Sequence, residues 1–150
     1  MKRMIVNKYG GPENLILDRV DSPLINDSSV RIKVENIGVN FADTLVIKGR
    51  YQERPRPPFS PGLELSGTII ETGKKVLNHK IGNRVIGIAK FGAYCNEIVM
   101  PAENVYKIPD SMDFVSAASF PVAYGTAFGA IDWKGNLKKG QTCLVIGAAG

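Results

Sequence analysis

The chain has 150 residues, of which 44% are hydrophobic and 22% charged, and its formal net charge at pH 7 is +5. This length suits one domain of about 100–200 residues with enough apolar material for its own core, so the fold needs no disulfide or metal as a staple. The basic residues are scattered, and no nucleic-acid-binding motif accompanies them, which argues against RNA or DNA as a partner. A phosphate-bearing small molecule, or solubility alone, explains the charge equally well.

The cysteines and the N-terminus indicate the compartment. The two cysteines, Cys95 and Cys143, lie far apart in unrelated contexts, and we expect both to be free thiols in a reducing environment. The basic start at residues 1–7 is not followed by the long apolar run that a signal peptide or a transmembrane helix requires. The sequence therefore predicts a cytoplasmic protein that does not engage a membrane.

The first half of the chain is predicted to be β structure. Residues 30–35 alternate strictly between apolar and charged side chains, the period of a strand with one face in a core and one in water. Two short apolar runs, 4–6 and 15–17, flank a turn signal at 9–12 and predict a hairpin. Further strands are predicted at 63–72, 84–89, 96–100 and 105–108, where Gly67, Gly82 and Gly87 indicate the bulges or bends of a small barrel.

Two other segments are predicted from their prolines and helix-capping residues. Residues 54–61 hold four prolines and should form an extended surface connection, because proline lacks a backbone donor and fixes φ. Further along, Ser111 is a candidate helix cap with Asp113 in the first turn. Two helices are predicted to follow, over 114–120, ended near Pro121, and over 122–133.

The last nine residues have the pattern of a strand followed by a cofactor loop. Residues 142–146 are the kind of apolar strand found in a parallel sheet with helices on both faces. The small residues that follow would let a backbone approach a pyrophosphate, although the later glycine and the helix of that fingerprint are absent. We expect this strand either to belong to a sheet cut short or to pair with another chain. The loop residues are Gly147, Ala148, Ala149 and Gly150.

A series of five segments, taken in order, resembles a known family. The series resembles the medium-chain dehydrogenase/reductase superfamily and, within it, the zinc-independent NADPH:quinone oxidoreductases of the zeta-crystallin branch, over essentially the whole chain and as the N-terminal portion of such an enzyme. The resemblance implies a mainly β fold with some α. It places a GroES-like β-barrel domain at residues 1–121, then the first helix and strand of a truncated Rossmann nucleotide-binding domain at 122–150. The five segments are 39–43, 61–67, 82–85, 120–127 and 145–150.

The resemblance also implies a site in a cleft between the two domains. Asn40 would contact the nicotinamide end of NADPH and, with Tyr51, is a candidate catalytic residue that donates to a substrate oxygen. Asp43 would shape the same segment, Thr126 would approach the nicotinamide, and the loop at 147–150 would hold the cofactor. From the residues alone, Asn40 could equally be a turn residue, Asp43 a helix cap, Tyr51 packing for the proline segment, and Thr126 a side chain bonded along its own helix.

The zinc-dependent branch of the superfamily differs at the corresponding positions. That branch has a cysteine where this chain has Asn40 and a histidine where it has Leu63, so of the ligand set only Glu64 remains. One carboxylate cannot hold a catalytic zinc, which takes three protein ligands, and we expect no metal. His79 lies in a polar stretch and is predicted to belong to a solvated loop. The mechanism would then reduce to positioning a nicotinamide against a quinone or an α,β-unsaturated carbonyl.

The sequence leaves alternatives for the substrate and for the oligomeric state. Leu45 stands where relatives often carry an aromatic residue, so enones and other activated alkenes remain alternatives to quinones. A homodimer is compatible with the resemblance. The parent protein is predicted to be an NADPH-dependent reductase, with the 150-residue chain inactive alone. The alternative is a non-enzymatic GroES-like binding module or gene relic, which would not bind NADPH.

Overall fold

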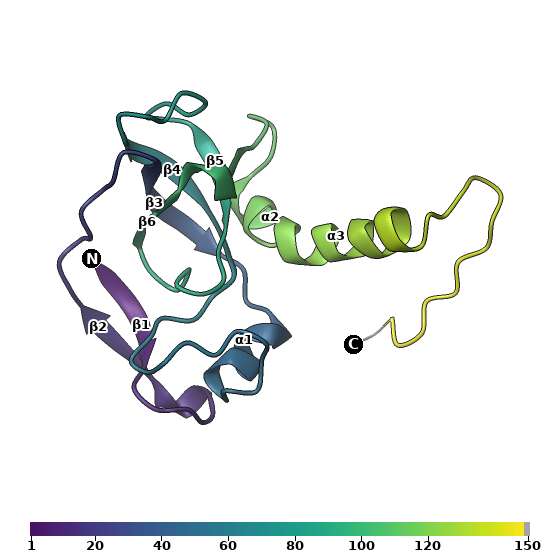
Figure 1. The fold of residues 1–150 in the computed structure, drawn as a ribbon, viewed down its shortest axis with the longest axis horizontal. Helices are drawn as coiled ribbons and strands as arrows, with labels where there is room; N and C mark the ends of the chain where they lie inside the picture. Colours follow the sequence, from purple (N-terminus) through teal and green to yellow (C-terminus); the bar gives the residue numbers. More distant parts are fainter. Residues whose placement is uncertain (149–150) are drawn as a thin grey trace.

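A computed structural model describes residues 1–148 of the chain (Figure 1). Its strands form two antiparallel sheets, a hairpin β1–β2 and a five-stranded sheet in the order β6-β3-β4-β5-β7. The fold is thus mainly β with some α, as predicted. The strands are β1 Lys2–Val6, β2 Leu15–Arg19, β3 Ser29–Ile37, β4 Glu64–Thr72, β5 Arg84–Ile88, β6 Glu97–Pro101 and β7 Val105–Lys107; the helices are α1 Phe41–Ile47, α2 Phe114–Ala118 and α3 Phe120–Phe128, with short 3-10 turns at Pro12–Asn14 and Ala102–Asn104.

Strand β3 lies between β4 and β6 in the larger sheet and follows the predicted alternation. Val30 and Ile32 are fully buried, whereas Arg31 projects from the other face. There its guanidinium pairs with Glu71 of β4 at 2.7 Å and with Glu97 of β6 at 2.9 Å. The main core gathers around the buried face; it contains Val30, Ile32, Leu65, Ile69, Val85, Ala93, Met100, Ala102 and Val105.

A second, smaller core joins the hairpin to α1. Val6 of β1 exchanges two backbone hydrogen bonds with Phe59, at 2.8 and 3.2 Å, and both side chains pack with Val46 and Ile47 of α1. The proline segment therefore has two parts. It runs along the surface up to residue 58, as predicted, but residues 59–61 are buried because Phe59 fills this cluster.

Glycines allow close approach at two places in the sheet. Gly67 of β4 lies at an irregularity in the β3–β4 register, where a Cβ would collide with the carbonyl oxygen of Lys33. Gly87 of β5 instead makes room for Met100, whose Sδ would lie 2.7 Å from an added Cβ. The predicted bulge is confirmed at Gly67, while Gly87 serves packing.

The first helix after the sheet begins at residue 114 as predicted but has a different cap, and the second begins at residue 120 instead of 122. Asp113, and not Ser111, caps α2: its carboxylate accepts from the Ser116 backbone N–H at 2.8 Å. Pro121 does not end the helical region, because it sits in the first turn of α3, where its missing N–H has no partner to lose. Helix α3 continues into a π-helical turn at Gly129–Lys134 and projects away from the sheets (Figure 1).

The predicted strand at 142–146 is wrong for this chain. The segment is irregular, and Leu144 and Ile146 are 82% and 88% exposed. A strand needs a neighbour to satisfy its backbone groups, and residues 1–148 provide none. Of the helix and strand predicted for residues 122–150, the described chain shows the helix α3 and no strand.

His79 is also placed differently from its prediction. Its side chain is buried, and Nε2 lies 3.1 Å from the carbonyl oxygen of Ala102 in the turn between β6 and β7. The residues around His79 in the sequence are polar, which indicated a solvated loop, but the His79 side chain points into the protein. Separately, none of the helices in the described residues is long and apolar enough to cross a membrane.

Candidate functional site

The predicted cleft residues Asn40 and Asp43 meet at the start of α1. Asn40 is the N-cap, with extended backbone angles, and its N–H donates to Asp43 Oδ2 at 2.8 Å. The Asp43 N–H in turn donates to the Asn40 carbonyl oxygen at 3.0 Å. This reciprocal pair satisfies backbone groups that a helix start leaves open. The N-cap is Asn40, however, and Asp43, which was considered for that position, is the third helical residue and accepts from the N-cap backbone instead. It also holds the Asn40 backbone in place.

Glu64 is one of two residues of this site that sequence reasoning missed; Tyr94, described below, is the other. Glu64 is 1% exposed and accepts from Asn40 Nδ2 with Oε1, and from the Val122 backbone N–H with Oε2, both at 2.8 Å. The sequence analysis identified it only as the remainder of a zinc ligand set. Its partners lie 24 and 58 positions away, and no local pattern signals such contacts.

A buried polar pair lies behind Asn40. The Tyr94 hydroxyl donates to Asp43 Oδ2 at 3.1 Å, and both side chains are buried. Burial raises the pKa of Asp43, although the Asn40 N–H and the Tyr94 hydroxyl oppose this effect by stabilising the carboxylate. Burial, and then the charge of Asp43, raise the pKa of Tyr94. Tyr94 therefore stays a neutral donor throughout the ordinary pH range.

The other predicted residues are not drawn together with Asn40 by any hydrogen bond in residues 1–148. Tyr51 is half-buried and packs against the smaller core around Phe59, which agrees with the packing alternative. Thr126 is exposed on α3. Gly147, with φ of 72°, and Ala148 are exposed in the irregular segment after residue 141, while Ala149 and Gly150 lie outside the described residues.

The residues before and after Asn40 in the sequence are apolar and exposed. Val39 is 74% exposed and Phe41 78% exposed, although the two are neighbours of a buried hydrogen-bond network. A nicotinamide ring is flat, largely apolar and carries one carboxamide, so an amide with exposed apolar neighbours in the sequence has the chemistry to meet it. The chemistry of these residues is therefore compatible with the nicotinamide end of NADPH that the family resemblance implies. The phosphate end is different, because Gly147 and Ala148 do not begin a helix in the described chain.

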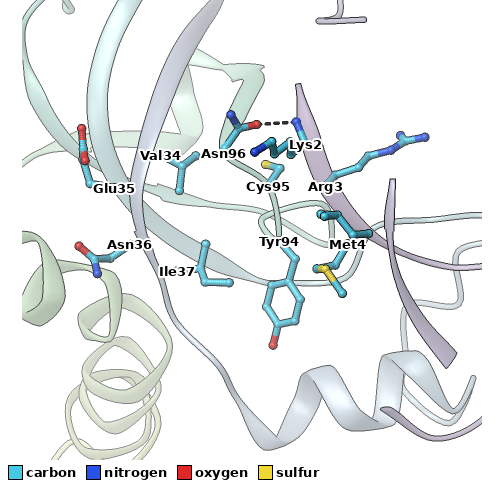
Figure 2. A pocket seen from close by; sticks show the side chains of 11 residues that line it. Lys2, Arg3, Met4, Val34, Glu35, Asn36, Ile37, Tyr94, Cys95 and Asn96 are labelled. Carbon is cyan, nitrogen blue, oxygen red and sulfur yellow. Dashed lines mark hydrogen bonds between the residues drawn. The ribbon is translucent and has the colours of Figure 1, made fainter. Parts of the chain in front are cut away.

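A separate groove lies between β1 and β3 (Figure 2). Its volume is about 350 Å³, and Asn40, Tyr51 and Thr126 do not line it. Tyr94 lies at its edge, with the hydroxyl pointing toward α1, while Cys95 and Asn96 lie beside Lys2. Burial raises the pKa of the Cys95 thiol to about 11, so this cysteine is a poor nucleophile. We assign no chemistry to this groove.

Metal-binding groups are dispersed over the part of the chain that the structure describes. Within residues 1–148, no three His, Cys, Asp or Glu side chains form a cluster suited to a metal ion. In particular, the Glu64 carboxylate faces two N–H groups. Zinc-independent chemistry stays a prediction.

Comparison with known proteins places this arrangement in a family. Residues 26–110 match the family model described as the alcohol dehydrogenase GroES-like domain. A quinone oxidoreductase-like protein 2 homolog of Nematostella vectensis is 40% identical over 99% of this chain and 41% of its own length. The chain thus spans about two fifths of the length of this curated relative.

Two solved structures extend the comparison. A probable oxidoreductase from Mycobacterium abscessus has a TM-score of 0.93 and 33% identity, covering all of this chain and 48% of its own. The Escherichia coli quinone oxidoreductase, solved in complex with NADPH, has a TM-score of 0.80 and 26% identity over 90% of this chain and 41% of its own. The chain belongs to the alcohol dehydrogenase GroES-like domain family, in the quinone oxidoreductase branch of the medium-chain dehydrogenase/reductase superfamily.

Proposed function

We propose that this chain forms the substrate-side domain of an NADPH-dependent reductase that acts on quinones or α,β-unsaturated carbonyls without zinc. The observation that supports this most strongly is Asn40. Its amide is held at the N-cap of α1 by a buried carboxylate, and its two neighbours in the sequence are exposed and apolar. The similarity to proteins named quinone oxidoreductases supports the substrate class.

NADPH, when bound, supplies the hydride that reduces the acceptor. The chain's residues would act by positioning. Asn40 would hold the nicotinamide carboxamide, and Val39 and Phe41 would cover the ring and exclude water. Such orientation brings two reactants together without new charge chemistry and accounts for much of the rate that a site can gain. Tyr51 remains the candidate donor to the substrate oxygen, and Thr126 would approach the nicotinamide from α3.

The test uses the polypeptide as its source makes it, because the chain spans about two fifths of its relatives' length. Its intact mass, compared with 16.3 kDa, defines the protein to assay. We expect NADPH oxidation that depends on an added quinone or enone and persists after dialysis against a chelator.

Asn40→Ala should lower kcat/KM by at least about 10-fold, because it removes an orienting contact. It also removes the N-cap side chain and leaves Glu64 Oε1 without a donor, so a loss of stability of about 1–3 kcal/mol should accompany it, and turnover is measured well below the melting temperature of the variant. Asn104→Ala, at an exposed position in the 3-10 turn before β7, is the matched control and should have no effect. Failure of the native-length protein to bind NADPH would favour the non-enzymatic binding module instead.

A further inference from the structure

The inference concerns the carboxylate of Glu64, the first residue of β4. Carboxylates are rarely buried unless their oxygens have partners, because the cost of losing hydration is high. Here each oxygen has one: Oε1 accepts from the Asn40 side chain and Oε2 from the backbone of Val122. The two donors belong to different parts of the chain, the turn before α1 and the first turn of α3. Glu64 thus links the two segments that would face the cofactor.

The contact with Glu64 determines which end of the Asn40 amide is free. An asparagine side chain has a donor end, Nδ2, and an acceptor end, Oδ1. A carboxylate only accepts, so it binds Nδ2 and turns Oδ1 away; Oδ1 faces the Asp43 backbone N–H in the capping box and keeps a second lone pair for another donor. The carboxylate itself has little room to move, since a Cβ on Gly38 would lie within 2.6 Å of the Glu64 Cδ. The orientation of the Asn40 amide is therefore set by buried groups and does not depend on a ligand.

We propose that Glu64 is a positioning residue of this site: it presents the Asn40 Oδ1 as an acceptor for the carboxamide N–H of the nicotinamide and ties that orientation to α3. The proposal rests on the reductase function proposed above. It deepens that function in one respect, because an Asn40 committed through Oδ1 to the cofactor leaves the substrate oxygen to another donor. The link to Val122 also fixes the start of the helix that carries Thr126.

The contact itself can be tested in the 150-residue chain by NMR of the Asn40 side-chain amide. We expect one Nδ2 hydrogen to exchange with solvent more slowly than the other, and Glu64→Gln to weaken that protection, because a glutamine has one acceptor oxygen and cannot accept from both Asn40 and Val122. Glu71→Gln, on the same strand but with a half-exposed side chain, should leave the Asn40 signals unchanged. Fast exchange of both Asn40 hydrogens in the unaltered chain would overturn the proposal, and that measurement needs no variant to fold.

The positioning role is tested by a double-mutant cycle in the native-length protein. Glu64→Gln should lower kcat on the order of 10-fold with little change in the KM for the quinone, because the acceptor is misaligned and not lost. Added to Asn40→Ala, it should cause no further loss, since it acts through Asn40. Glu71→Gln should keep wild-type kinetics.

Full additivity of the two losses would mean that Glu64 acts elsewhere, and the positioning role would be refuted. An unaltered protein without NADPH-dependent turnover would refute the proposed function and, with it, the nicotinamide half of this proposal. In that case the exchange data would still decide the contact between Glu64 and Asn40, so the two failures can be told apart.

Discussion

The hydroxyl of Tyr94 donates a hydrogen bond of 3.1 Å to Asp43 Oδ2, across 51 positions of sequence and inside the protein. The same carboxylate oxygen accepts from the Asn40 backbone N–H at 2.8 Å. Tyr94 therefore supports the start of α1 from the side opposite to solvent. The geometry of Asn40 depends on this buried layer as well as on Glu64.

Tyr94→Phe should lower the free energy of unfolding by about 1–3 kcal/mol, because it removes the hydroxyl and leaves a buried carboxylate with one partner fewer. Urea denaturation followed by circular dichroism measures this change. Tyr106→Phe is the matched control, since Tyr106 is half-exposed on the edge strand β7. Equal stability of the two variants would show that the buried bond contributes nothing measurable.

The raised pKa of Asp43 predicts a particular pH dependence. Burial disfavours the charged form in the folded state, so the carboxyl binds a proton more readily there than in the unfolded chain. Its contribution to stability should be fully present below the ordinary pKa of 3.8 and should be lost as pH rises through the raised value. At pH values above the raised pKa, the buried charge of Asp43 therefore lowers the free energy of unfolding.

The comparison with Asp43→Asn isolates this contribution, because other carboxyls titrate alike in both chains. The pKa of Glu97, for example, is lowered, first by a hydrogen bond from the Ser22 hydroxyl. The stability that Glu97 contributes is therefore lost as pH falls, which is opposite to the effect of Asp43, but this loss is common to both chains. The stability of the unaltered chain relative to Asp43→Asn should rise as pH falls from 7 toward 4. A flat or falling difference would contradict the burial argument.

The two cysteines should differ in reactivity. Burial raises the pKa of Cys95 to about 11, so at pH 8 only about one thiol in a thousand is a thiolate. Cys143 is exposed. Iodoacetamide at pH 8 should therefore label Cys143 first, as read by peptide mass spectrometry, and the Cys143→Ser chain should react slowly. Rapid labelling of Cys95 in the folded variant would contradict its burial.

The sheet could be predicted from the sequence where one face is buried. The alternation at 30–35 identified β3, because each side chain in such a strand reports the face on which it lies. The strand predicted around Val145 was wrong for the opposite reason. Their apolar run indicates a strand only if adjoining strands exist to pair with it, and the described residues provide none.

The site was predicted only in part. Asn40 and Asp43 were identified, and the structure brings them together in a local cap that spacing can signal. Glu64, Tyr94 and the inward turn of His79 depend on partners 23 to 58 positions away. Contacts of that kind arise from the packing of the whole sheet, so a single sequence without an alignment contains no local sign of them.

The irregular C-terminal segment predicts rapid hydrogen exchange. Val145 is 66% exposed, and the last backbone hydrogen bond before it in residues 1–148 is from Gln141 to Lys138. The amide of Val145 should therefore exchange nearly as fast as in an unfolded peptide, whereas that of Ile32 in β3 should be protected. NMR exchange at a concentration where light scattering gives a monomer measures both. Strong protection of Val145 in that monomer would contradict the irregular conformation, whereas protection that grows with concentration would identify pairing with a second copy of the chain.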